Sequence, residues 1–211
     1  MASSISYDET VAWIHRFADV IAERRDELTR LDTAIGDADH GTNMYRGMRA
    51  AVERVDALDG DDISAALKGV GMALVSKVGG AAGPLYGTMF LQMANAAGDG
   101  SEVDLAGWTQ MLQAGLKGVQ MRGKAEPGDK TMVDALAPAV EALERAQDDG
   151  AELPAALERS AQAAREGMEK TVPMVARKGR ASYLGERSAG HQDPGATSSY
   201  LLLQAAVDAL G

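Results

Sequence analysis

The sequence lacks cysteine entirely, has few aromatic residues and contains no long hydrophobic run. The absence of cysteine excludes disulfides, thiolate catalysis and cysteine-ligated zinc or iron–sulfur sites, so a bound metal would have oxygen or imidazole ligands. No stretch approaches the roughly 20 apolar residues of a membrane span, and the first residues do not form a basic and then apolar leader. We therefore expect a protein of the cytoplasm.

Positive charge is also scarce, because 21 basic residues stand against 31 acidic ones and give a net charge of −10. Such a surface disfavours broad binding to nucleic acid or to anionic membranes, although a small anion could still bind in a local positive pocket. With 211 residues, 45% of them hydrophobic, the chain is long enough to bury a core. The composition predicts one domain over 1–211.

Apolar residues recur at helical spacing along almost the whole chain, as at Trp108, Met111, Leu112, Leu116 and Val119. Aromatic residues are only 4% and alternating apolar runs are absent, so a sheet is not expected. The pattern predicts an all-α fold, a bundle of eight helices near 6–31, 42–57, 62–77, 84–97, 104–120, 131–148, 152–172 and 196–210.

Several residues have the character of helix starts. Ser6 and Glu9 have the spacing of a capping box, and Asp104 precedes a periodic run. Pro84 and Pro154 stand where a first helical turn is expected.

The link after the first predicted helix is unusually acidic, with three carboxylates in eight residues: Asp32, Asp37 and Asp39. These carboxylates would repel one another unless a cation lies between them, and hard ions such as Mg²⁺ prefer oxygen ligands. An EF-hand does not fit, because counting from Asp37 puts Gly41 and Met48 where that loop needs oxygen ligands. The sequence therefore predicts a magnesium site, with a solvated turn as the alternative.

Three other links are rich in glycine or basic residues: 79–84, 122–132 and 176–195. If successive helices alternate in direction, these links and the acidic link all lie at the same end of the bundle. That end is the predicted active site.

The chemistry of these links suits a phosphate-bearing ligand. Glycines followed by Pro84 at a helix start would direct backbone N–H groups toward an anion, although a tight turn explains them equally well. The arginines of 177–187 could each donate two hydrogen bonds to a phosphate, or the basic residues could form a solvated patch. Asp193 could cap the last helix or reach a ribose. No Walker sequence, protein-kinase signature, HExxH or GxSxG occurs in the chain.

Four long motifs resemble one known family: IGDADHGTN at 35–43, VGGAAGPL at 78–85, RGKAEPGDKTM at 122–132, and ARKGRASYLGERS followed by GHQDPGA over 176–196. The chain is similar over nearly its whole length to the nucleotide-binding L subunit of bacterial dihydroxyacetone kinase. This resemblance implies an eight-helix antiparallel, up-and-down, barrel-like bundle with the nucleotide at one tip.

The resemblance also implies a mechanism and partners. In the phosphoenolpyruvate-dependent type, ADP and two Mg²⁺ stay bound to the L subunit, and a histidine-phosphorylated phosphotransferase partner converts the ADP to ATP. The ATP then phosphorylates dihydroxyacetone on a separate K subunit. Because the chain carries only the L-like part, a separate subunit is favoured, and whether it forms a homodimer is left open.

Matching the motifs residue by residue implies roles for particular positions. Asp32, Asp37 and Asp39 would hold Mg²⁺, and no residue of this chain would act as general base, since positioning and charge neutralisation suffice for phosphoryl transfer. Related proteins often have serine at Ala82, so a hydroxyl contact to phosphate is missing here. The implied nucleotide contacts are His40, Gly41, Thr42, Asn43, Ala81, Ala82, Gly123, Met132, Arg180, Asp193, Pro194 and Gly195.

Two other functions stay open from the sequence. One is an ATP-exchanging subunit of a triose or tetrose kinase, which would turn over with ATP and a K-like partner. The other is a non-enzymatic module that senses ADP and transfers no phosphoryl group.

Overall fold

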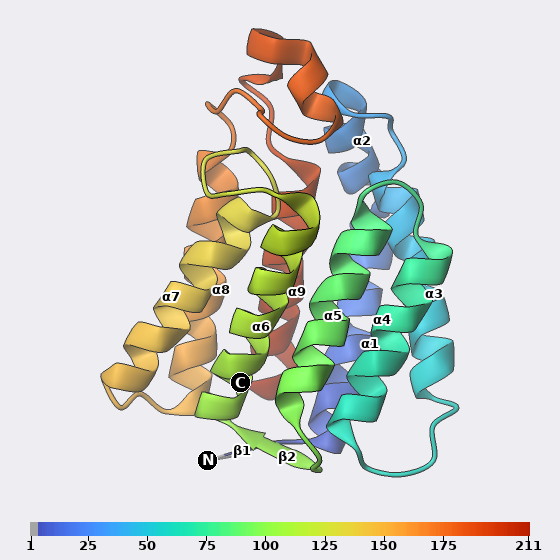
Figure 1. Cartoon of the computed structure of the whole chain (residues 1–211), viewed down its shortest axis with the longest axis vertical. Coiled ribbons are helices and arrows are strands. Elements are labelled where there is room, and N and C mark those ends of the chain that lie inside the picture. The colour runs from blue at the N-terminus through green and yellow to red at the C-terminus, as the bar shows by residue number, and fades with distance from the viewer. Residues whose placement is uncertain (1–3) are drawn as a thin grey trace.

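The structure, a computed structural model, describes residues 4–211. These residues form nine α-helices, one 3₁₀ helix and two short strands (Figure 1). In chain order the elements are β1 (Ser4–Ser6), α1 (Tyr7–Glu23), α2 (Arg25–Ile35), α3 (His40–Val55), α4 (Ile63–Lys77), α5 (Ala82–Ala97), β2 (Glu102–Asp104), α6 (Leu105–Gly123), α7 (Val133–Asp148), α8 (Leu153–Lys170), the 3₁₀ helix η1 (Arg180–Ser188) and α9 (Pro194–Leu210).

The helices pack side by side in chain order from α3 to α9, and α9 returns to lie against α1, which also contacts α3. Their apolar faces meet in one continuous core whose largest side chains include Trp13, Phe17, Phe90 and Trp108. The rings of Trp13 and Trp108 meet edge to face with centroids 4.9 Å apart, an arrangement that aromatic pairs prefer. The all-helical class predicted from the sequence is confirmed, while barrel-like closure stays a prediction.

The predicted first helix, 6–31, is wrong in its continuity and its end. The helix is interrupted at Arg24, where φ is −98° and ψ is 9°, and α2 then runs to Ile35. Neither glycine nor proline marks this break. The break follows from packing, because α2 leaves α1 and buries Leu28 and Ile35 against α3, α9 and η1.

The expectation that the chain has no sheet is also wrong in detail. β1 pairs antiparallel with β2, with Ile5 opposite Val103. Each strand has only three residues, too few for an alternating pattern to be recognised. Each strand leads directly into a helix, and its last residue, Ser6 or Asp104, is the predicted N-cap. The capping box between Ser6 and Glu9 is confirmed.

The other helices lie within three residues of their predicted ends, although α3, α5 and α9 each begin two residues early. Pro84 and Pro154 both fall in first helical turns, as predicted. The early starts matter for the site, because they bring His40, Ala82 and Pro194 to the first positions of their helices. Within residues 4–211, no helix combines the length and hydropathy that crossing a bilayer requires.

Candidate nucleotide and metal site

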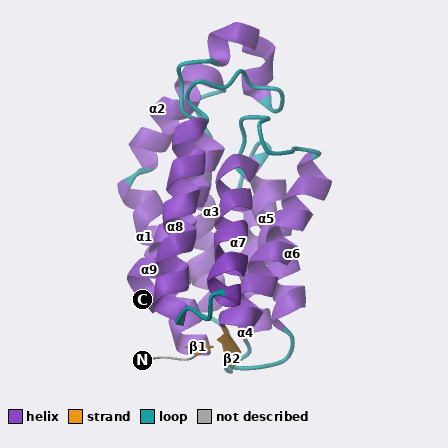
Figure 2. Cartoon of the chain, turned by 90° about the vertical axis from the view of Figure 1, so that its left-hand side faces the viewer, coloured by secondary structure: helices purple, strands orange, loops and turns teal. Residues whose placement is uncertain are grey.

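The four links singled out in the sequence meet at one end of the molecule, the end that carries α2 and η1 in Figure 1 and lies opposite the two strands. Figure 2 shows the same loops gathered beyond the ends of the long helices. They surround one open cavity, at the end of the bundle where alternating helix directions predicted that the links would meet. Its lining comprises Asp32, Ile35, Gly36, Asp37, Asp39, His40, Gly79, Gly80, Ala81, Ala82, Leu85, Tyr86, Lys130, Thr131, Met132, Lys178, Gly179, Arg180, Ala181, Asp193, Pro194 and Gly195.

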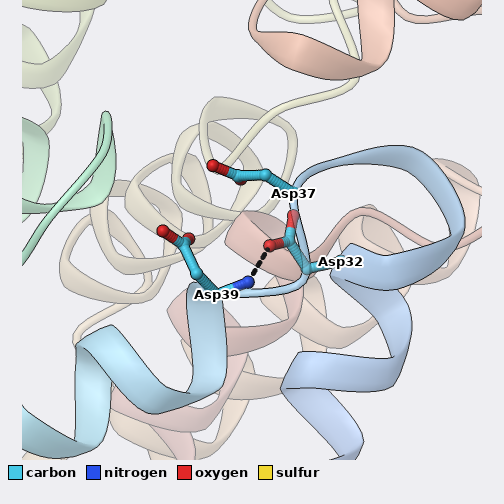
Figure 3. Close-up of side chains that lie close together, drawn as sticks. All are labelled: Asp32, Asp37 and Asp39. Atoms are coloured by element: carbon cyan, nitrogen blue, oxygen red, sulfur yellow. Dashed lines mark hydrogen bonds between the residues drawn. The ribbon is translucent and has the colours of Figure 1, made fainter.

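The three predicted metal ligands lie together where α2 gives way to α3 (Figure 3): Asp32 is in the last turn of α2, and Asp37 and Asp39 are on the link that follows. One carboxylate oxygen from each of Asp32, Asp37 and Asp39 lies within 4.8 Å of the others. Asp32 is buried, and its Oδ2 accepts the backbone N–H groups of Asp39 (2.8 Å) and His40 (3.1 Å). These bonds fix one oxygen of Asp32 and leave Oδ1 for another partner.

Glycine at position 36 keeps space beside that free oxygen. A Cβ on Gly36 would lie 1.9 Å from Asp32 Oδ1, so any larger residue would displace the carboxylate. An all-oxygen donor set with one buried, oriented carboxylate is what Mg²⁺ prefers. The residues present therefore fit a magnesium ion.

Arg180 links the far side of the cavity to this cluster. Its Nη2 lies 3.0 Å from Asp37 Oδ2, although Arg180 is 64% exposed and Asp37 32% exposed. A surface ion pair of this kind contributes little to stability. Arg180 is therefore free to exchange the carboxylate for another anion in the cavity, such as a phosphate.

His40 lines the cavity with one face and enters a buried polar chain with the other. Its Nε2 lies 2.9 Å from Ser198 Oγ, which in turn lies 2.7 Å from the hydroxyl of Tyr86. Ser198 Oγ is also 3.1 Å from the carbonyl oxygens of Pro194 and Gly195, which can only accept. These carbonyls favour Ser198 as the donor to one of them, and so favour the neutral tautomer in which His40 Nε2 carries the proton and donates to Ser198.

Burial lowers the pKa of His40 to about 4, against the opposing effect of Asp32 and Asp37. The ring is therefore neutral at pH 7, with a lone pair on Nδ1. A hydrogen bond from Nδ1 to a phosphate oxygen would need a second ring proton, which a phosphate anion favours.

The glycine-rich link ends at the N-terminus of α5. Ala81 is the N-cap and Ala82 the first helical residue, and no side chain caps the helix. Gly80 has φ of +64°, and a Cβ on Gly83 would lie 2.2 Å from the carbonyl oxygen of Val78. The link thus presents unpaired N–H groups at the positive end of a helix, which is favourable for an anion.

Asp193 caps α9 by accepting the N–H of Ala196 at 2.7 Å, which confirms the capping reading of this residue. The carboxylate is buried, and burial raises its pKa to about 7 despite the hydrogen bond from Ala196. Asp193 N–H donates to Thr171 Oγ1 at 3.0 Å. These bonds fix the turn 193–195 at the mouth of the cavity.

Not every position implied by the resemblance lines the cavity. Gly41 is buried against α2, and Asn43 accepts a hydrogen bond from Arg46 at 2.8 Å. Gly123 ends α6 beside Leu85, and Thr42 is exposed. Their contacts to a nucleotide stay predictions.

Three buried polar side chains at the site had no role predicted from the sequence: Tyr86, Lys130 and Ser198. Tyr86 joins Ser198 and Ser199, and its pKa is raised chiefly by burial. Lys130 was visible only as one residue of the link 122–132. No local pattern identifies any of them, because their partners are more than 40 residues away in the chain.

A family model described as the DAK2 domain matches residues 34–208. The chain belongs to the DAK2-domain family. It is 48% identical over 201 residues to "PEP-dependent dihydroxyacetone kinase, ADP-binding subunit DhaL" of Escherichia coli, covering 95% of this chain and 96% of that protein. It is 44% identical to the DhaL subunit of dihydroxyacetone kinase 1 of Listeria innocua, over 95% of this chain and 96% of that one. The resemblance drawn from the motifs is thereby confirmed.

A solved structure supports the fold of this DAK2 chain. The dihydroxyacetone kinase from C. freundii, in complex with AMP-PNP and Mg²⁺, superposes with a TM-score of 0.71 at 24% identity. The match covers 94% of this chain but only 33% of that one. This DAK2 chain therefore spans about a third of the larger kinase.

Proposed function

We propose that this DAK2 chain is the ADP-binding subunit of a dihydroxyacetone kinase that takes its phosphoryl group from phosphoenolpyruvate through a phosphotransferase system. The observation that carries the proposal is the placing of three carboxylate oxygens within 4.8 Å of one another, in the same cavity as the uncapped N-terminus of α5. Full-length similarity to proteins named as ADP-binding DhaL subunits supports the same function.

In this proposal Asp32, Asp37 and Asp39 hold two Mg²⁺. When bound, magnesium would be held by these carboxylates and would neutralise negative charge on the phosphate. The N–H groups of Ala81 and Ala82 and the ring of His40 hold the phosphates from the other side. Arg180 leaves Asp37 and donates two parallel hydrogen bonds to the phosphoryl group as charge develops on it during transfer.

The remaining implied contacts enclose the rest of the nucleotide. Met132 and Gly123 border the adenine or ribose, and the turn Asp193–Gly195 closes the site. Gly41, Thr42 and Asn43 form the first turn of α3, whose N-terminal end faces the cavity at His40. No residue here acts as a base, because phosphoryl transfer through a loose transition state needs positioning and charge neutralisation.

The proposed partners are those that the family resemblance implies. A phosphohistidine on a donor subunit gives its phosphoryl group to ADP, and the N–P bond is replaced by the new P–O bond of ATP. The hydroxyl of dihydroxyacetone, held on a K subunit, then takes the group and loses its proton to a base on that subunit. ADP stays bound and is ready for the next cycle.

The experiment that tests the proposal is to denature freshly purified protein, identify the released nucleotide, and measure how fast labelled ATP replaces it in the native protein. Retained ADP that exchanges more slowly than turnover supports the relay. An empty or rapidly exchanging site contradicts it and favours the ATP-exchanging subunit or the sensor. Ala82, which lacks the hydroxyl common among relatives, is then the first residue to restore, as Ala82→Ser.

Asp37→Ala provides the matched functional test. The loss of one of three ligands should abolish phosphoryl transfer with all partners present. The fold should remain, because within residues 4–211 the side chain of Asp37 makes only the ion pair to Arg180. Asp61→Ala, an exposed carboxylate on the link before α4, is the control. A fully active Asp37→Ala protein would exclude the proposed metal site.

A further inference from the structure

Lys130 is fully buried, with 1% of its surface exposed, and no carboxylate forms an ion pair with it within residues 4–211. Its Nζ instead donates to four backbone carbonyl oxygens. The acceptors are Thr171 (2.9 Å), Met174 (3.1 Å), Ser188 (2.8 Å) and His191 (2.5 Å). An ammonium group has three protons, so the four carbonyls share them.

These four carbonyls lie near the two ends of one segment. Thr171 is the C-cap of α8, and Ser188 is the last residue of η1. Carbonyl groups at a helix end lack partners within the helix and carry partial negative charge, so a cation is favourable there, although the Thr171 carbonyl also accepts the N–H of Met174 at 3.2 Å. Lys130 therefore ties both ends of the segment 171–191, which we call the cover segment, to one atom.

Lys130 itself has a rigid support. Its φ is +63°, a conformation that a lysine adopts only when its surroundings impose it. Asp134, in the first turn of α7, accepts the N–H groups of Gly128 (2.5 Å) and Thr131 (2.7 Å) and so fixes the link on both sides of Lys130. The ammonium is thus held from α7 and reaches across to the cover segment.

Apart from Lys130, the N–H of Arg177 joins the cover segment to the carbonyl oxygen of Asp129 at 3.0 Å, and the N–H of Gly190 bonds within the segment to Val172. Its apolar contacts form a small cluster apart from the main core, made of Ile35, Ala176, Ala181 and the half-buried Leu184. Yet it carries Arg180, which reaches Asp37 across the cavity, and it leads directly into Asp193. A segment with few buried apolar contacts opens easily unless polar contacts restrain it.

We infer that Lys130 is a positioning residue that holds the cover segment closed over the cavity and thereby sets how slowly bound nucleotide is released. The inference rests on the proposed function, because slow release matters only if ADP is a retained cofactor. Lys130 acts through the carbonyl groups of the cover segment and needs no contact with the nucleotide. Loss of its ammonium frees four carbonyls at once.

The test compares Lys130→Met with two controls. Lys117→Met removes an exposed lysine from α6, and Ile63→Ala destabilises the core at the start of α4, at the opposite end from the site. The first measurement is hydrogen exchange of the amides of Ala176, Gly190 and Asp193 without nucleotide. The second is the release of a fluorescent ADP analogue, with Mg²⁺, into excess unlabelled ADP.

In Lys130→Met we expect both exchange and release to become roughly 10- to 100-fold faster, the effect of losing one or two charge-assisted hydrogen bonds. Ile63→Ala should lower the melting temperature without accelerating release, which separates positioning from a general loss of stability. If Lys130→Met does not fold, Lys130→Gln, which keeps two N–H donors, is measured instead. Unchanged exchange and release would overturn the inference.

The two proposals can fail separately. A wild-type protein that binds no ADP overturns the proposed function, while hydrogen exchange in the cover segment still decides whether Lys130 anchors it. Retained ADP with no effect of the lysine variant overturns only the role of Lys130.

Discussion

At the scale of single residues, Tyr86 and Tyr183 carry the same hydroxyl group in opposite surroundings. Tyr86 is fully buried and bonded to Ser198 and Ser199, whereas Tyr183 is 87% exposed. Tyr86→Phe leaves Ser199 without its hydroxyl partner in the interior, so we expect it to lower the free energy of unfolding by about 1–3 kcal/mol. Chemical denaturation measures this loss.

Tyr183→Phe is the matched control, since its hydroxyl group faces water and its removal should leave stability unchanged. Equal effects of the two variants would contradict the buried chain that joins His40 to α5 and α9.

Asp193 makes stability depend on pH in a direction opposite to that of most carboxylates. In the unfolded chain its pKa lies near the usual value of about 3.9, but burial raises it to about 7 in the folded protein. The folded state therefore binds more protons between these values, and the contribution of Asp193 to stability is lost as the pH rises from about 4 to about 7. Its slope is at most about 1.4 kcal/mol per pH unit.

Asp193→Asn keeps an oxygen that can cap α9 but removes this titration. We expect the variant to gain stability relative to wild type as the pH rises from 5 to 8, measured by urea unfolding at each pH without metal or nucleotide. All other titrating groups are common to both proteins, so the difference reports Asp193. A difference that does not change with pH would contradict a buried, protonated Asp193.

At the scale of elements, the approach of α3 to α2 is close because residue 41 is glycine. A Cβ at Gly41 would lie 2.0 Å from the carbonyl oxygen of Arg25 and 2.6 Å from Thr29 Oγ1. Gly41→Ala must therefore push the helices apart, and we expect a loss of about 1–3 kcal/mol in the free energy of unfolding. Because His40 and Asp39 precede it, the variant should also bind Mg²⁺ more weakly, as titration calorimetry can show.

Gly69→Ala, in α4, is the control for this packing effect. Its new Cβ would come no closer than 3.6 Å to Arg54, and alanine favours a helix by about 1 kcal/mol over glycine. The control should therefore be neutral or stabilising. If both variants were neutral, the close approach of α2 and α3 would be wrong.

The elements themselves show what a sequence can and cannot specify. Helical periodicity located the long helices to within three residues at most ends, because one face of each helix must be buried. The break at Arg24 escaped prediction, since it depends on where α2 packs rather than on the residues at the break. β1 and β2 escaped because a three-residue pair is held by its partner, 98 residues away, and leaves no local pattern.

At the scale of the whole molecule, the alternation of the helices was enough to place the site. Four links far apart in the chain were predicted to meet at one end, and the cavity there is lined by residues of the acidic link and of the links 79–84, 122–132 and 176–195. The interior of the site was not predictable in the same way. The four carbonyls around Lys130 and the chain from His40 to Tyr86 depend on contacts between distant elements, which no motif encodes.

A ligand that joins the four links should stabilise the whole fold, because α2, α3, α5 and α9 all border the cavity. If ADP with Mg²⁺ binds only the folded state, a ligand concentration of 100 times Kd adds about 2.7 kcal/mol. For a domain of this size, that corresponds to a rise of about 5–10 °C in Tm, measured by thermal scanning of nucleotide-free protein.

Removal of the metal should weaken this stabilisation specifically. With ADP and EDTA, the three carboxylates face the phosphates without a cation between them, so the repulsion reduces binding and the rise in Tm should largely disappear. With ADP and Mg²⁺, the Tm of Asp37→Ala should rise as little as that of wild type with ADP and EDTA, whereas the Tm of Asp61→Ala should rise as much as that of wild type. An equal rise in Tm with and without Mg²⁺ would mean that the phosphates bind away from the acidic cluster, at the N-terminus of α5 alone.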